Sequence, residues 1–125
     1  MVIGVGTDLA EIARIQQSIT RFGDRFLQRI FTLAEIEYCQ RKKNAAESFA
    51  ARFAAKEAAA KALGTGISHG ISWLEIEVAR EPQGRPFLLL TGRAAQRAQQ
   101  IGVTRTSLSL THSRETALAV VVMED

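Results

Sequence analysis

With 125 residues, of which 46% are hydrophobic and 23% charged, the chain has the size and composition of one globular domain, which excludes extended disorder. No apolar run approaches the ~18 residues that cross a bilayer, and the first residues lack the basic segment of a signal peptide. The single cysteine, Cys39, excludes an internal disulfide and favours a cytoplasmic protein. A net charge of +3 suits an acidic partner or a phosphate-rich ligand.

The first predicted element is a strand over residues 2–8. Alternation places Gly4 and Gly6 on the same face as Asp8. Glycine in a strand often marks the close approach of a ligand or another backbone, so Asp8 ends a face that is cleared of side chains. Two interpretations stay open. Asp8 caps the helix that follows, or it binds a hard metal ion such as Mg²⁺.

The elements that follow carry helical and then strand patterns. Thr32 and Glu35 match a capping box, while Gly23 and Gly64 are predicted to end helices. Helices are expected over residues 11–22, 32–40, 45–63 and 92–101, and strands over 73–79, 86–91, 105–111 and 116–122. This order predicts an α+β fold, with a mainly antiparallel sheet packed on a long central helix, in one domain over residues 1–125.

The longest predicted helix carries charged residues beside its apolar side. Phe49 and Phe53 define the buried side, and Glu57 lies about 40° around the helix from Phe53. A carboxylate there is costly unless it is paired or binds a metal ion. One interpretation is an ordinary i,i+4 pair with Lys61, worth about 0.3–0.5 kcal/mol. The other is a pyrophosphate site, because cations flank Glu57 and the helix leads into a glycine turn. The residues concerned are Arg52, Lys56, Lys61, Gly64, Thr65 and Gly66.

A third candidate is the segment Ser107-Leu-Ser-Leu-Thr-His-Ser113, which ends a predicted strand in polar residues. Alternation turns Leu108 and Leu110 inward. A histidine and hydroxyl groups at a strand end can bind phosphate or transfer a proton, so His112 is a candidate site residue. A structural role for this histidine is the alternative.

Three segments, in this order, resemble one known family. They are Gly4-Val-Gly-Thr-Asp8-Leu-Ala-Glu11-Ile, Phe49-x-x-Arg52-Phe-Ala-x-Lys56-Glu57-Ala-x-x-Lys61-Ala-x-Gly64 and Leu108-Ser-Leu-Thr-His112-Ser. Together they closely resemble the holo-acyl-carrier-protein synthases, the small single-domain type of the 4'-phosphopantetheinyl transferase superfamily. The resemblance spans the whole chain. Thr111 stands where many relatives carry serine, and it keeps the hydroxyl.

The resemblance implies a 4'-phosphopantetheinyl transferase-like fold and a Mg²⁺-dependent reaction. A serine of an apo-acyl carrier protein attacks the β-phosphorus of coenzyme A, giving holo-acyl carrier protein and adenosine 3',5'-bisphosphate, in support of fatty acid biosynthesis. The implied metal ligands are Asp8 and Glu57. Glu57, or a metal-bound water that it polarises, is favoured as the general base, and Lys61 neutralises phosphate charge. The implied coenzyme A contacts are Arg52, Lys61, Gly64, Thr65, Gly66 and His112, in a homotrimer with sites between subunits.

The carrier protein needs a docking surface. Arg14, Arg21 and Arg25 fall within a stripe about 40° wide if the first helix continues through Gly23. A basic stripe suits an acidic helix on the carrier, and the resemblance favours docking over an ordinary solvated face. The runner-up is a transferase for a polyketide or peptide synthase carrier. A rival of a different class is a non-catalytic basic module that binds nucleic acid; it is disfavoured because the eight aromatic residues (six Phe, one Trp and one Tyr) fall mostly at core positions. A membrane partner is not expected, since no long apolar run is present.

Overall fold

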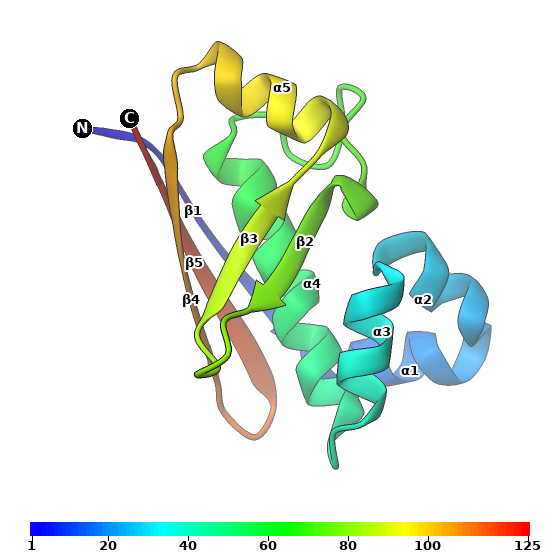
Figure 1. Cartoon of the computed structure of the whole chain (residues 1–125). Helices are drawn as coiled ribbons and strands as arrows, with labels where there is room; N and C mark the ends of the chain where they lie inside the picture. Colours follow the sequence, from blue (N-terminus) through cyan, green and yellow to red (C-terminus); the bar gives the residue numbers. More distant parts are fainter.

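The computed structural model describes all residues from 1 to 125 and combines helices with antiparallel sheet (Figure 1). The strands are β1 (Val2–Glu11), β2 (Ile76–Arg80), β3 (Pro86–Leu90), β4 (Arg105–His112) and β5 (Thr116–Glu124). The helices are α1 (Ile12–Phe22), α2 (Asp24–Ile30), α3 (Leu33–Gln40), α4 (Ala45–Ala62) and α5 (Gly92–Gln100), with a 3₁₀ turn, η1, at Trp73–Glu75. The predicted α+β class is confirmed.

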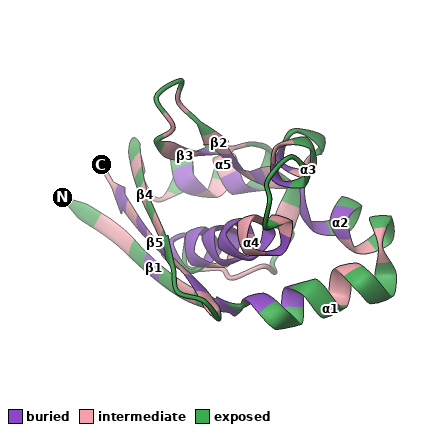
Figure 2. Cartoon of the chain, turned by 90° about the horizontal axis from the view of Figure 1, so that it is seen from below, coloured by how far each residue is buried: buried purple, intermediate pink, exposed green.

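The long helix α4 lies in the middle of the molecule. One antiparallel sheet has the strand order β1-β5-β4, and β2 pairs with β3 in a separate antiparallel hairpin. Figure 2 shows α4 between the three-stranded sheet, the hairpin and α1. Because 12 of its 18 residues are buried, its alanine-rich sequence is required for packing on several sides and not only for helix propensity. No helix in the chain is both long and apolar enough to cross a membrane.

β1 packs directly on α4 through its two glycines. A Cβ on Gly6 would lie 1.8 Å from the carbonyl oxygen of Ala58, and one on Gly4 would lie 2.1 Å from that of Ala62. No side chain fits at either position, so the backbones of strand and helix meet without side chains between them. This confirms the prediction that the glycine face marks a close approach, and it brings Asp8 beside the C-terminal half of α4.

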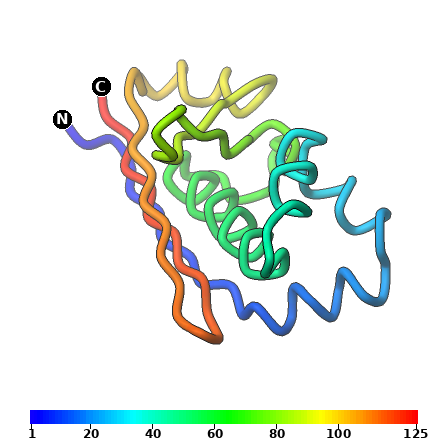
Figure 3. The backbone as a smooth tube through the Cα atoms, turned by 60° about the horizontal axis from the view of Figure 1, so that its bottom comes forward, coloured from blue at the N-terminus to red at the C-terminus, as the bar shows by residue number.

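The three-stranded sheet buries one face and exposes the other. β5 is its central strand, and the two chain termini lie side by side at one end of it (Figure 3). Alternate residues of β5 are buried on the α4 side, namely Ala117, Ala119, Val121 and Met123. On the opposite face, Val5 and Leu9 of β1 are 56% and 63% exposed, beside the partly exposed Leu118, Val120 and Val122. β4 contributes Ser107, Ser109 and Thr111 to the same face, so only its β1 and β5 part is mostly apolar. No helix covers this face (Figure 2).

Most boundaries differ from the predicted ones by one or two residues, and three differences are larger. Gly23 has a φ of 57° and separates α1 from α2, a seven-residue helix that the sequence patterns did not predict. Residues 73–75 form η1 and are not the start of a strand. β1 continues to Glu11, which occupies the N-cap position of α1, while Asp8 pairs with Ala119 within the sheet. The capping interpretation of Asp8 is therefore wrong. The capping box of Thr32 and Glu35 is confirmed.

Candidate active site between β1 and α4

Two carboxylates and a lysine meet where β1 crosses α4. Asp8 comes from β1, and Glu57 and Lys61 come from successive turns of α4. Lys61 Nζ donates a hydrogen bond to Asp8 Oδ1 at 2.9 Å and another to the carbonyl oxygen of Thr7 at 3.1 Å. Lys61 is thus paired with Asp8 of the neighbouring strand and not, as in the ordinary helix interpretation, with Glu57.

The two carboxyl groups affect each other electrostatically. Burial raises the pKa of Glu57, the Asp8 carboxylate raises it further, and Lys61 partly opposes both effects. The pKa of Lys61 is also raised, because its ammonium group donates to Asp8 and lies close to that negative charge. Positive charge near both carboxyl groups relieves their repulsion, and Lys61 already supplies part of it beside Asp8. A cation bound between the two carboxyl groups would relieve it further.

Asp8 and Glu57 offer few side-chain ligands for a metal ion. No group of three or more His, Cys, Asp or Glu side chains gathers anywhere in the chain. Carboxylate oxygens suit Mg²⁺, which is usually held by one or two carboxylates together with substrate phosphates and water. Asp8 and Glu57 fit that pattern, in which the remaining ligands come from outside the protein.

The glycine turn after α4 has its backbone donors already engaged. Gly64 N–H donates to the carbonyl oxygen of Lys61, and Thr65 and Gly66 N–H both donate to that of Ala60. Gly64 and Gly66 have φ values of 80° and 64°, which explains why glycine is needed at both positions. These N–H groups end the helix and are not free for phosphate. The Thr65 hydroxyl likewise donates within the turn, to the carbonyl oxygen of Gly66 at 2.9 Å, so the small size of the glycines is the feature that suits a ligand here.

The basic cluster inferred from the sequence does not form around Glu57. Arg52 is 3% exposed, stacks 4.4 Å above the Tyr38 ring of α3 and donates to the carbonyl oxygen of Ser48. Lys56 is fully buried and pairs with Glu35 at 2.7 Å. Both side chains leave α4 roughly 100–140° away from Glu57 around the helix, which directs them toward α3 and β2. Only Lys61 joins the carboxylates, and the predicted contact of Arg52 with coenzyme A stays a prediction.

His112 lies near the other end of α4. Its Nε2 is 3.3 Å from Glu47 Oε1 in the first turn of that helix. Lys61 follows Glu47 by 14 residues, a rise of roughly 21 Å along the helix axis. One chain therefore keeps His112 far from the glycine turn, whereas Asp8 lies opposite Ala119, which pairs with Leu110, two residues before His112 on β4.

The three arginines predicted to dock the carrier do not form one helical stripe. Arg14 and Arg21 are exposed on α1, and Arg21 lies 5.2 Å from the ring of the exposed Phe22. Arg25 is exposed on α2, because the helix is interrupted at Gly23. The structure thus keeps Arg14 and Arg21 on one element and places Arg25 on the next.

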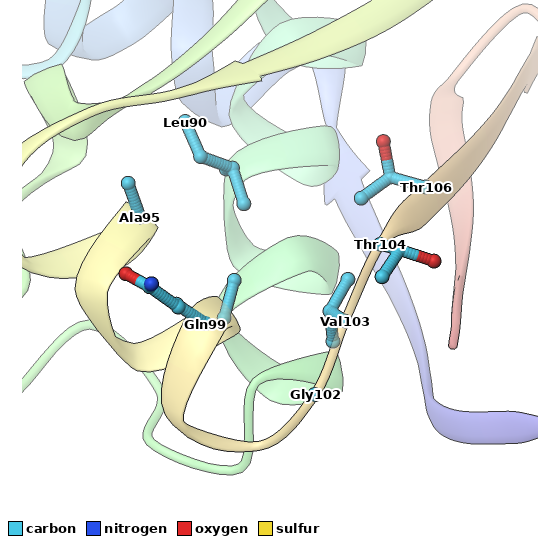
Figure 4. Close-up of a pocket in the computed structure, with 8 residues that line it drawn as sticks. Leu90, Ala95, Gln99, Gly102, Val103, Thr104 and Thr106 are labelled. Carbon is cyan, nitrogen blue, oxygen red and sulfur yellow. The ribbon is translucent and has the colours of Figure 1, made fainter.

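Two hollows contain residues that the sequence analysis missed. One adjoins the glycine turn and includes His69, Arg93 and Arg97, of which Arg97 donates to the carbonyl oxygen of Leu63 at 3.0 Å. The i,i+4 spacing of Arg93 and Arg97 was the available signal. The other lies between α5, the end of β3 and the start of β4 (Figure 4). It is lined by alanine, leucine, valine, glycine, glutamine and threonine side chains, with no charged group.

Comparisons with known proteins agree on one family. The sequence model described as the 4'-phosphopantetheinyl transferase superfamily matches residues 4–121. A protein of Koribacter versatilis (strain Ellin345) named holo-[acyl-carrier-protein] synthase is 58% identical over 125 residues, which are 100% of both chains. The crystal structure of holo-[acyl-carrier-protein] synthase from Neisseria meningitidis has a TM-score of 0.92 and 35% identity, and covers 100% of both chains. The Helicobacter pylori synthase in complex with coenzyme A has a TM-score of 0.85 and 34% identity, over 96% of this chain and 99% of that chain. The chain therefore belongs to the 4'-phosphopantetheinyl transferase superfamily.

Proposed function

We propose that this protein transfers the 4'-phosphopantetheine group of coenzyme A to a serine of an apo-acyl carrier protein, in support of fatty acid biosynthesis. The products are holo-acyl carrier protein and adenosine 3',5'-bisphosphate. The observation that carries the proposal is the meeting of Asp8, Glu57 and Lys61 at the β1–α4 contact, in a chain 58% identical over its full length to a holo-[acyl-carrier-protein] synthase. In this proposal the enzyme consists of one transferase domain over residues 1–125 and acts in the cytoplasm.

The reaction requires Mg²⁺ in this proposal, with Asp8 and Glu57 as the protein ligands. Two oxygen donors fit such an ion, and the pKa of one of them, Glu57, is raised by burial and by the neighbouring Asp8 carboxylate. When bound, Mg²⁺ stabilises the charge of the pyrophosphate as it reacts. Lys61, which is half-exposed and already beside Asp8, neutralises further phosphate charge.

Glu57 accepts the proton of the carrier serine, directly or through a water. Its raised pKa brings it closer to the value that suits a general base near neutral pH. The serine oxygen then forms a bond to the β-phosphorus, and the bond from that phosphorus to the bridging oxygen breaks. The bridging oxygen leaves with adenosine 3',5'-bisphosphate.

Two features support a homotrimer with sites between subunits. His112 and the Gly64–Gly66 turn lie at opposite ends of α4, so a single coenzyme A that contacts both receives them more easily from two chains. The β1 and β5 part of the outer sheet face carries uncovered apolar side chains, which are costly to expose to water and suit burial against another subunit. Arg52, Lys61, Gly64, Thr65, Gly66 and His112 are the proposed coenzyme A contacts in that assembly.

The carrier protein docks on α1 and α2 in this proposal. Arg14 and Arg21 on α1 and Arg25 on α2 are exposed positive charges. α1 follows β1 directly in the chain, only a few residues after Asp8. Acidic carrier helices would be steered to this surface and held by it.

The test is a transfer assay read by mass spectrometry. The protein is incubated with coenzyme A, Mg²⁺ and an apo-acyl carrier protein of fatty acid synthesis, and the carrier is expected to gain the mass of one phosphopantetheine group. A carrier whose acceptor serine is replaced by alanine, and a reaction with EDTA, should show no gain. If only a polyketide or peptide synthase carrier is modified, the choice of partner is wrong. If no carrier is modified, the transferase proposal itself fails.

A further inference from the structure

A buried ion pair lies one residue before Glu57 on α4. Lys56 has no exposed surface, and Glu35 of α3 is 1% exposed. Lys56 Nζ lies 2.7 Å from Glu35 Oε1 and donates to the carbonyl oxygens of Ile76, at 2.6 Å, and Trp73, at 3.1 Å. Each of the three protons of the ammonium group therefore has an acceptor.

Glu35 extends this network to two further elements. Its Oε1 accepts the N–H of Thr32 at 2.8 Å, at the start of α3, and its Oε2 accepts the N–H of Val78 at 2.8 Å, within β2. The pair thereby ties α3, η1 and β2 to a single turn of α4. No other polar side chain in the middle of α4 connects so many elements.

Stability is a weak explanation for such a pair. The loss of hydration of two buried charges opposes their attraction, and apolar residues of similar volume often replace buried ion pairs without loss of stability. An apolar contact, however, does not specify how a helix is rotated about its own axis. The large side chains of α4, Phe49 and Phe53, lie before Lys56 and pack on Phe31 and Trp73. The buried residues nearest to Lys56 are otherwise small (Ala54, Ala55, Ala58 and Ala59) and offer no ridge of their own against rotation of this part of the helix.

The direction of Lys56 determines that of Glu57, because successive helical residues are about 100° apart. We propose that the Glu35–Lys56 pair is a positioning element, which sets the rotation of α4 and so holds the Glu57 carboxylate toward Asp8 for metal binding. Neither Lys56 nor Glu35 touches substrate in this role. The inference rests on the proposed function, in which Asp8 and Glu57 hold Mg²⁺.

The test measures metal binding directly, with Mn²⁺ as a paramagnetic probe in the presence of coenzyme A. The double variant Lys56→Met/Glu35→Leu removes the pair and keeps apolar bulk. It is expected to fold, to raise the Mn²⁺ Kd about tenfold, and to raise the Mg²⁺ concentration for half-maximal transfer in parallel. The KM for the carrier protein should stay unchanged, because the docking surface on α1 is not altered. Glu35→Asp, which withdraws the carboxylate by one methylene and keeps its charge, should show a smaller rise.

Ile76→Val is the matched control. It removes a buried methylene next to the pair and leaves the backbone carbonyl that accepts from Lys56. This variant should lower the Tm and leave the Mn²⁺ Kd unchanged, which separates positioning from general destabilisation. Wild-type Mn²⁺ affinity in the folded double variant, or in Glu35→Asp if the double variant does not fold, overturns the inference. A wild-type protein that binds no Mn²⁺ refutes the proposed function, and the inference with it.

Discussion

Gly6→Ala is the most direct test of how the site is built. The added methyl group would lie 1.8 Å from the carbonyl oxygen of Ala58, whereas ordinary van der Waals contact begins at 3.4 Å. The Ala58 oxygen is part of the α4 backbone and the new Cβ is bonded directly to the β1 backbone, so no flexible side chain can move aside. The backbones of β1 and α4 must therefore separate by about 1.6 Å, the difference between these two distances. Overpacking of this kind costs on the order of 3 kcal/mol, at the upper end of its usual range. For a chain of this length, that lowers the Tm by roughly 10 °C.

The same displacement affects the chemistry. Asp8 lies two residues after Gly6 on the same strand, and Mg²⁺ accepts ligand oxygens only at about 2.0–2.1 Å in a near-regular octahedron. A shift of β1 by more than 1 Å separates Asp8 from Glu57, so kcat/KM for transfer should fall on the order of 100-fold or more. The assays are thermal unfolding, followed by initial rates of carrier modification well below the Tm.

Gly84→Ala provides the control. Gly84 has a φ of 100° but no side-chain or backbone atom closer than 4.0 Å to an added Cβ, and it lies in the β2–β3 turn away from the site. Backbone strain should therefore lower its Tm while turnover stays near that of the wild type. A Gly6→Ala protein with wild-type Tm would refute the close approach of β1 and α4. One that is destabilised but turns over normally would show that this approach does not set the active site.

The other predictions concern charge at the site and on α1. Because the folded-state pKa of Glu57 is raised, the contribution of this group to stability is present below the ordinary carboxyl pKa and is lost as the pH rises through the folded value. Glu57→Gln should therefore raise the Tm of the metal-free protein at pH 7 but not at pH 4. The same substitution should nearly abolish transfer, and near-normal turnover at saturating Mg²⁺ would reject Glu57 as a ligand. Asp8→Asn should also abolish transfer and should bring the pKa of Lys61, measured by NMR titration, down toward its ordinary value; an unchanged titration would contradict the Asp8–Lys61 contact. Arg14→Ala combined with Arg21→Ala should raise the KM for the carrier and weaken the salt dependence of the rate, with the KM for coenzyme A nearly unchanged; an unaltered carrier KM and salt slope would make α1 an ordinary solvated face.

Local patterns in the sequence determine most of the secondary structure and part of the site. The capping box at Thr32, the long alanine-rich helix and the glycine face of β1 each depend on neighbours within a few residues, and each appears in the structure as predicted. The angle between Glu57 and Lys61 around α4 follows from helix geometry alone. The short helix α2 escaped prediction, because it has no side-chain cap and only seven residues.

Tertiary structure decided which of the charged residues work together. Arg52, Lys56 and Lys61 all look alike as cations of one helix, yet they have Tyr38, Glu35 and Asp8 as their respective partners. The position of His112 at the far end of α4 likewise depends on the register of β4 with β5. Helical periodicity fixes the angle between two side chains but not the element that each one meets. That choice depends on contacts between residues far apart in the chain, and here it depends on two glycines that let β1 approach α4 closely enough for Asp8 to join Glu57.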